Sequence, residues 1–413
     1  MLESKFKEPA AIERWREQGH GWWINSLVGS LVEDGYALST VQLYLRAIAQ
    51  FARWAERNRL AVCDLDESVV GAFVEEQERQ GRYPTQRPAL VRLLDHLRTE
   101  GVVATPEPRL AEAPAAQLVG RYEDYLRIER GLAPATVTGY RPFVERFLAE
   151  VVSDAPLGLG KLVPADVSRF VLRHTPYMSR GRAKLMVTAL RSFLRFLFQR
   201  GEVEVDLAVC VPSVPGWRLT GIPKHLGVDE VEVLLDACDR RTGKGRRDYA
   251  ILLLLARLGL RAGEVVALQL GDIDWRAGEL TVPGKGLRRD RLPLLADVGE
   301  ALAAYLCRDR PASRTRRVFV RMRAPHRGFA SPSAVDTIVC RALGRAGLDP
   351  AVKGAHLLRH SLATGMLRRG ASMAEIGEVL RHRSSMTTEI YAKVDLDSLR
   401  CLAQPWPVTR GGR

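Results

Sequence analysis

The C-terminal part of the 413-residue sequence contains cationic, imidazole and phenol side chains at spacings that could bring them together. Two arginines can each bind two oxygens of an anion through a planar guanidinium, and a histidine can move protons near neutral pH. A tyrosine hydroxyl can attack phosphorus and stay bound to it, while a lysine can give a proton to the leaving alkoxide. Such a set suits the cleavage of a phosphodiester. Its members are Arg261, Lys285, His356, Arg359, His382 and Tyr391.

Each of these residues also has a simpler interpretation when it is taken alone. An arginine beside a helix is usually a surface residue or an ion-pair partner, and a tyrosine such as Tyr391 is usually a packing aromatic. His356 and His360 are four residues apart, as in a metal-binding helix, but the sequence HLLRH lacks the glutamate of the HExxH motif. We therefore interpret His360 as a core histidine that is hydrogen-bonded to the backbone.

The elements that must position these side chains follow from hydrophobic periodicity. Residues 248–260 have the pattern of a helix, and residues 333–402 have helical patterns broken by glycines. Residues 279–294 predict a β-hairpin with Lys285 in its turn. The segment RRVFV, residues 316–320, is a candidate third strand. The C-terminal part is therefore predicted to be mainly helical with a small sheet.

The composition excludes several classes of protein. The sequence is 46% hydrophobic and 27% charged, which is typical of a globular protein, and no apolar run approaches the roughly 20 residues that cross a bilayer. The first residues have no signal-peptide core. Six scattered cysteines without a CxxC pair argue against a zinc site or a disulfide framework. We therefore expect a cytoplasmic protein.

The net charge of +14 indicates a polyanionic partner, most commonly DNA or RNA. Arginine provides almost all of the excess, with 53 arginines against nine lysines, and codon usage in a GC-rich genome would give the same bias. Acidic residues lie between the arginines of the N-terminal unit, so this unit could bind DNA or a neighbouring protomer, and we favour DNA. The arginines in question are Arg53, Arg57, Arg59, Arg79, Arg82 and Arg87.

A repeat organises the N-terminal half. Residues 35–51 and 131–147 share Gly, Ala, Thr, Val, Tyr and Phe at a constant offset, and residues 90–101 resemble residues 190–201 in their helical pattern and closing glycine. The repeat predicts two tandem helical domains before the C-terminal domain. The predicted boundaries are residues 1–109 for the N-terminal domain, 114–212 for the second domain and 222–413 for the C-terminal domain.

The order and spacing of the candidate residues resemble the tyrosine recombinase (phage integrase) family. LGLRAGEVVAL, around Arg261, is similar to the family's first arginine box, and GKGLRRDRLPL is similar to its hairpin lysine box. The run from HLLRH to the tyrosine is similar to its second box. The resemblance reaches back over the second helical unit, which is similar to the family's core-binding domain, a SAM-like fold. Two departures are Arg381, where the family usually has glycine, and the repeated N-terminal unit.

The resemblance implies that Arg261 and Arg359 face a scissile phosphate and neutralise the charge that grows on its non-bridging oxygens. It also implies that Glu264 orients Arg261, although an ordinary helix-surface glutamate is the alternative. These assignments explain why a permanent cation begins the helix after residues 248–260.

The remaining candidates would carry out the chemical step in this family. Tyr391 attacks phosphorus and forms a 3′-phosphotyrosyl link, and Lys285 gives a proton to the 5′-hydroxyl that is freed. His356 takes the tyrosine proton or holds a phosphate oxygen, and His382 bonds another oxygen. Because one ester replaces another of similar energy, neither ATP nor a metal is required, and we expect no cofactor.

The resemblance also implies the partners. Double-stranded DNA at specific recombination sites is the substrate, for an integrase or a transposase, with a dimer on each site and a tetramer in the synapse. Accessory recombinases or DNA-bending proteins, and a location on the bacterial nucleoid, belong to the same expectation. The helical spacing of leucines in residues 396–402 predicts a C-terminal segment that packs on a neighbouring protomer.

Two other functions stay open from the residues alone. A type IB topoisomerase-like enzyme shares the same constellation but acts as a single subunit, and a DNA-binding regulator could carry a vestigial site. The complete set of six residues argues against the regulator. The tandem helical domains favour a recombinase over a topoisomerase.

Overall fold

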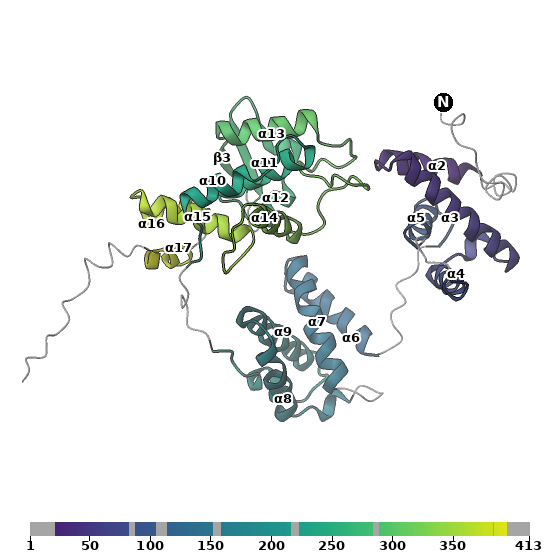
Figure 1. The fold of residues 1–413 in the computed structure, drawn as a ribbon. Coiled ribbons are helices and arrows are strands. Elements are labelled where there is room, and N and C mark those ends of the chain that lie inside the picture. The colour runs from purple at the N-terminus through teal and green to yellow at the C-terminus, as the bar shows by residue number, and fades with distance from the viewer. Residues whose placement is uncertain are drawn as a thin grey trace, which may run out of the picture. The chain divides into compact units, whose positions relative to one another are not determined.

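Figure 1 shows the helices and strands of the computed structural model. The structure describes residues 21–81, 87–104, 114–151, 158–215, 223–283, 289–382 and 384–394. Helices predominate there, and the strands form one three-stranded sheet, so the predicted class, mainly α with a small β-sheet, is confirmed. Residues 104–220 form one compact unit, and residues 1–103 and 221–413 form the other. Within the described residues, no helix combines the length and the apolar character of a membrane span.

Four helices in the N-terminal residues enclose a hydrophobic core of their own. They are α2 (Gly21–Glu33), α3 (Leu38–Arg57), α4 (Glu67–Arg79) and α5 (Arg87–Thr99). Helix α3 buries Val41, Leu45 and Ile48 on one face, which is the spacing of an amphipathic helix. Asp66 caps α4, since its carboxylate accepts a hydrogen bond of 2.9 Å from the backbone N of Val69.

The second helical unit repeats this pattern around a separate core. Its helices are α6 (Pro114–Asp124), α7 (Pro134–Val151), α8 (Pro164–His174) and α9 (Arg180–Gln199). Phe51 in α3 and Phe147 in α7 occupy equivalent positions of the sequence repeat, and both are fully buried. Gly35 and Gly131, which precede these two helices, both have positive φ. The repeat in the sequence therefore corresponds to two similar helical units.

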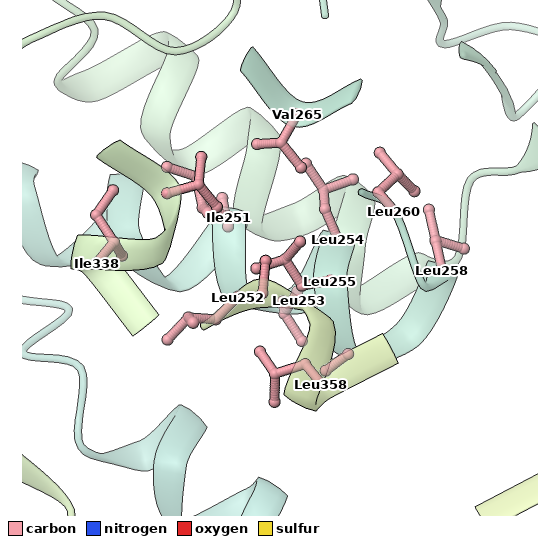
Figure 2. Packing of buried hydrophobic residues seen from close by; sticks show 14 of the residues in the cluster. Ile251, Leu252, Leu253, Leu254, Leu255, Leu258, Leu260, Val265, Ile338 and Leu358 are labelled. Atoms are coloured by element: carbon pink, nitrogen blue, oxygen red, sulfur yellow. The ribbon is translucent and has the colours of Figure 1, made fainter. Parts of the chain in front are cut away.

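The C-terminal residues are built around one apolar helix. The helices of this part are α10 (Val228–Asp236), α11 (Gly243–Leu258), α12 (Ala262–Ala267), α13 (Ala296–Arg308), α14 (Ser333–Arg345) and α15 (Ala355–Arg368). The side chains from Ile251 to Leu255 on α11 are all buried, and Figure 2 shows them with Val265, Ile338 and Leu358 from three other helices. A helix that is apolar on every side must be covered on every side, which makes α11 the centre of this core.

A small antiparallel sheet lies in this C-terminal part. Its strands are β1 (Ile273–Asp274), β2 (Glu279–Pro283) and β3 (Arg289–Pro293), in the order β1-β2-β3. Leu280 on β2 lies opposite Leu292 on β3, as the predicted hairpin requires. A tight turn with Gly278 at a φ of 65° joins β1 to β2, and Ile273 pairs with the other side of Leu280. The strand before β2 in the sequence, β1, therefore pairs with the edge of β2 that β3 leaves open.

The predicted third strand at residues 316–320 is wrong. This segment makes two isolated bridges, from Arg317 to Gln269 and from Val320 to Gly328. Because β1 already pairs with the second edge of β2, the segment has no strand there along which it could extend. Its apolar residues are nevertheless buried in the core, which accounts for the strand-like pattern of the sequence.

Short helices complete the described C-terminal part. They are α16 (Met373–Val379), α17 (Ser385–Thr388) and a 3₁₀-helix, η8 (Glu389–Val394). A small second core contains Ala363 from α15, Ile376 from α16, Leu380, and Tyr391 from η8. The predicted glycine breaks are present here, since Gly370 follows α15 with a φ of 87°. The predicted segment at residues 396–402 lies outside the described residues.

Candidate active site

Arg261 stands at the start of α12, directly after the end of α11. Gly259 ends α11 with a φ of 58°, a left-handed conformation that glycine adopts without strain. The Glu264 carboxylate accepts hydrogen bonds from the Arg261 backbone N at 2.8 Å and from its Nη1 at 2.6 Å. Glu264 is buried, whereas the Arg261 side chain is 41% exposed. The carboxylate therefore fixes a guanidinium that remains open to a ligand.

Arg359 lies on α15 and is only 3% exposed. Its Nη1 donates to the carbonyl of Gly259 at the end of α11, and its Nη2 donates to the carbonyl of Leu380 after α16. Burial, followed by the nearby charges of Arg261 and Arg381, lowers the pKa of Arg359 to about 10. The side chain is still a cation at neutral pH, and it joins the ends of two helices.

Tyr391 is buried and lies 2.8 Å from a histidine, measured from its hydroxyl to Nδ1 of His360. Burial raises the pKa of Tyr391, and the charge of Arg359 opposes this effect. The interpretation of His360 as a core histidine bonded to the backbone is therefore wrong, because its described partner is the tyrosine hydroxyl. The i,i+4 spacing from His356 was the available signal, since it places both rings on one side of α15, where their centroids are 6.1 Å apart.

His382 lies between the short helices at the C-terminal end. Its Nδ1 is 2.8 Å from Oγ1 of the buried Thr388, and its ring is parallel to that of Tyr391 at a centroid distance of 6.4 Å. Burial, followed by the charges of Arg359 and Arg261, lowers the pKa of His382 to about 4. The pKa of His356 is lowered by the same three causes, although this residue is exposed. Both rings are therefore neutral at pH 7.

A cleft brings several of these groups to one surface. Its charged and polar lining residues include Arg261, Glu264, Arg289, Asp290, Arg381 and His382. Lys285 lies outside the described residues, but strands β2 and β3, which flank its loop, both contribute residues to the lining. Arg261 and His382 thus share the cleft, whereas Arg359 and Tyr391 are buried. Within the described residues, no three His, Cys, Asp or Glu side chains are grouped as a metal site.

Comparisons with known proteins identify the family of the chain. Residues 224–397 match the model of the phage integrase family, and residues 119–201 match the model of the phage integrase N-terminal SAM-like domain. Tyrosine recombinase XerD of Mycobacterium tuberculosis (strain ATCC 25618 / H37Rv) is 36% identical over 304 residues, which cover 69% of this chain and 95% of XerD. The chain belongs to the phage integrase family. It is a tyrosine recombinase, an enzyme that cleaves and rejoins DNA at specific sites.

One relative matches this recombinase over most of its length. The protein y4rA of Sinorhizobium fredii (strain NBRC 101917 / NGR234), named as an integrase/recombinase, is 46% identical over 379 residues, which cover 91% of this chain and 92% of y4rA. The match covers 91% of this chain, whereas residues 1–109 alone are about a quarter of its 413 residues. The uncovered part is therefore much smaller than the N-terminal unit. Most of the N-terminal unit is therefore shared with y4rA.

Two solved structures share the fold of the recombinase. XerH site-specific recombinase bound to a palindromic difH substrate has a TM-score of 0.55 and 21% identity, and the match covers 70% of this chain and 85% of that chain. A lambda integrase (75–356) dimer bound to a COC' core site has a TM-score of 0.52 and 18% identity, with 72% and 99% coverage.

The neutral histidines predict that acid destabilises the recombinase. The pKa values of His360 and His382 are about 4 in the folded chain and about 6.5 in an unfolded one. The unfolded state therefore binds more protons than the folded state, and the free energy of unfolding falls as the pH falls from about 6.5 to 4. The loss is less than about 1.4 kcal/mol per pH unit for each ring, because both rings are partly exposed. Thermal unfolding of the His360→Asn and His382→Asn variants at pH 7 and pH 5 should show a smaller pH shift than the parent chain. An equal change of the unfolding midpoint between pH 7 and pH 5 in all three proteins would show that other groups cause the pH dependence.

Proposed function

We propose that the recombinase cleaves DNA when Tyr391 attacks a phosphodiester bound by Arg261 and Arg359. The bond between the tyrosine oxygen and phosphorus forms, the bond from phosphorus to the 5′-oxygen breaks, and Lys285 gives a proton to that oxygen. The product is a 3′-phosphotyrosyl link, and the phosphodiester is restored when a 5′-hydroxyl of the partner strand attacks it. His356 and His382 donate hydrogen bonds to phosphate oxygens, because neutral imidazoles retain one N–H each.

The observation that carries this proposal is a pair of arginines held close together at the end of α11. Arg359 donates to the carbonyl of Gly259, two residues before Arg261, and each arginine sits in the positive field of the other, since Arg261 lowers the pKa of Arg359. Two neighbouring like charges, one of them buried, repel each other, and an anion between them removes this cost. A phosphate that gains charge as it becomes five-coordinate is stabilised further.

The tyrosine needs an acceptor for its proton, and His360 is bonded to the hydroxyl. In the free protein the transfer is strongly uphill, because burial raises the pKa of Tyr391 while burial, the neighbouring His356 and the charge of Arg359 lower the pKa of His360 to about 4. A bound phosphodiester adds negative charge beside these groups, which raises the pKa of the imidazole and that of the phenol alike. We propose that His360 takes the tyrosine proton as the bond between the tyrosine oxygen and phosphorus forms.

A covalent-trapping experiment tests the proposed function. Duplex fragments of the DNA that flanks the gene, each with a nick in the cleaved strand a few nucleotides 3′ of the cut, release the short 5′-hydroxyl product and prevent religation. A protein–DNA adduct that survives detergent should accumulate, and it should form in EDTA, because ester exchange requires neither ATP nor a metal. No adduct on any flanking fragment would favour a DNA-binding regulator. Relaxation of supercoiled plasmid that lacks these sites would favour a topoisomerase-like enzyme.

The proposed division of labour follows the three predicted domains. Residues 222–413 carry the chemistry, residues 114–212 bind the core of the DNA site, and residues 1–109 bind DNA beside it. We further propose a dimer on each site and a tetramer in the synapse, with helper recombinases or DNA-bending proteins as additional partners on the nucleoid. Lambda integrase itself has been solved as a dimer on a core site and as a tetramer on a Holliday junction.

The N-terminal unit has exposed arginines that suit a phosphate backbone. Arg53, Arg57, Arg59 and Arg79 are exposed, and among the described residues none of them forms an ion pair. By contrast, the Glu67 carboxylate is held by both terminal nitrogens of Arg98 at 2.7 Å. The exposed arginines are thus available to a phosphate backbone, with exposed acidic residues such as Glu56 and Glu75 beside them.

This unit is therefore expected to contribute to the salt dependence of DNA binding. Replacing Arg53, Arg57 and Arg59 with glutamine should flatten the plot of log affinity against log salt by about 0.9 for each lost phosphate contact. Arg98→Gln is a matched control in the same unit, because both terminal nitrogens of this arginine are bound to the Glu67 carboxylate at 2.7 Å. A triple variant with an unchanged slope and impaired assembly of protomers would show that the unit binds a neighbouring subunit.

A further inference from the structure

The turn that carries His382 has an unusual residue at its centre. Leu380 ends α16, the backbone N of Arg381 donates to the carbonyl of Glu378 at 2.9 Å, and the backbone N of His382 donates to the carbonyl of Gly377 at 2.8 Å. This is the Schellman ending of a helix, in which the residue at the Arg381 position is usually glycine. Arg381 adopts a φ of 54°, which is strained for a residue with a side chain. An arginine that keeps this conformation must contribute through its side chain.

The side chain of Arg381 is buried between two carboxylates and is only 7% exposed. Its Nη2 donates to Oε2 of Glu264 at 2.7 Å, and its Nε lies 3.9 Å from Oδ2 of Asp290 on β3. Within the described part of the chain, Nε and Nη1 of Arg381 are buried without a hydrogen-bond partner. The guanidinium therefore lies between the start of α12, the turn of His382, and the part of β3 next to the loop that contains Lys285.

Glu264 consequently has two arginine partners, one on each side. Arg261 binds Oε1, and Arg381 binds Oε2, which also accepts from the Arg261 backbone. A carboxylate that is paired with Arg261 alone would cancel its charge toward the cleft. With Arg381 present, Arg261, Glu264 and Arg381 carry a net charge of +1 and line the same cleft, while the Asp290 carboxylate lies farther from Arg381, at 3.9 Å from its Nε. The second arginine thus frees the charge of the first for a ligand.

We propose that Arg381 is a positioning residue of the cleavage reaction, which shares the Glu264 carboxylate so that Arg261 keeps its positive charge for the scissile phosphodiester. The inference rests on the proposed function, because it assigns Arg261 to that phosphate. It distinguishes this recombinase from an enzyme with glycine in the same turn, where Glu264 would have Arg261 as its sole arginine partner in the cleft.

A double-mutant cycle with the trapping substrate tests this role. The nicked flanking duplex is mixed with excess full-length enzyme, and the rate of adduct formation and the apparent DNA affinity are measured for Arg381→Gly, Glu264→Gln and the double variant. Arg381→Gly should lower the rate about 10-fold with a smaller change in affinity. In the Glu264→Gln background, where no carboxylate charge needs to be shared, the same change should alter the rate less than about 2-fold.

Arg381→Asn separates the charge from the backbone. Asparagine tolerates positive φ and is neutral, so it should match glycine if the charge is what matters. Wild-type rates for the Gly and Asn variants, or equal losses in both Glu264 backgrounds, would overturn the inference. Failure of the wild-type chain to form an adduct, or an adduct that persists in Tyr391→Phe, would instead overturn the proposed function.

Discussion

A Tyr391→Phe variant is expected to bind DNA and to form no covalent complex. The ring is 2% exposed and packs against Ile376 and Leu380, so phenylalanine retains the contacts of the small C-terminal core. The hydroxyl is bonded to Nδ1 of His360, which is itself partly exposed and can bond to water when the hydroxyl is absent. The change therefore removes the nucleophile and leaves the fold in place.

The measurement is detergent-resistant adduct on the nicked duplex, alongside DNA affinity from a gel-shift titration. Tyr249→Phe is a matched control, because Tyr249 lies on α11 with its ring under the guanidinium of Arg240 at 4.8 Å, a contact that phenylalanine preserves. The control should form adduct at the parental rate. Adduct formation by the Tyr391→Phe variant would show that another residue attacks phosphorus.

The second large effect is expected at Arg261. Loss of one preorganised donor to a transition-state anion costs about 2.7–4 kcal/mol, so Arg261→Ala should slow cleavage by about 10²–10³-fold. DNA affinity should change little, because many other phosphate contacts remain. Arg261→Lys should restore only a small part of the rate, since an ammonium cannot bind Glu264 and two phosphate oxygens with one planar group.

Arg257→Ala is the control for a lost charge on the same segment of chain. Arg257 lies in the last turn of α11, and its guanidinium is bound by Glu232 at 2.9 Å and by Asp297 at 3.1 Å. Its replacement should leave the rate of cleavage unchanged. A comparable loss of rate in the two alanine variants would indicate a general electrostatic effect and would argue against a specific role of Arg261.

Arg359 calls for a different experiment, because its replacement is expected to affect folding. The side chain satisfies the carbonyls of Gly259 and Leu380, and alanine would leave both without this donor in a buried place. Arg359→Ala should therefore lower the midpoint of thermal unfolding as well as the rate of cleavage. This makes Arg261, with its exposed guanidinium, the better residue for measuring the contribution of a cation to the chemistry.

Local patterns allowed much of this structure to be predicted. The family resemblance implied that Glu264 lies beside Arg261, and the two residues are in contact at the start of α12. The periodicity of residues 248–260 predicted a helix, and α11 occupies residues 243–258. The repeat predicted two helical units with similar buried positions. Such inferences succeed because helix and hairpin geometry fix which residues share a face.

Contacts between distant segments could not be predicted in the same way. His360 and Tyr391 are 31 residues apart, and their hydrogen bond depends on how η8 packs against α15. Arg381 is 117 residues from Glu264, and its left-handed backbone is visible only in the folded turn. The spacing along a helix predicts which side chains share a face. Tertiary packing decides which other element contacts that face.

The two bonds of Arg359 have a consequence for the way in which relatives of this enzyme can diverge. A copy of the gene that no longer needs to cut DNA can lose the Tyr391 hydroxyl and still encode a folded protein. The same copy cannot readily lose Arg359, because that side chain closes the junction between the ends of α11 and α16. In descendants that only bind DNA, this arginine is therefore expected to outlast the tyrosine, and its presence alone is poor evidence of activity.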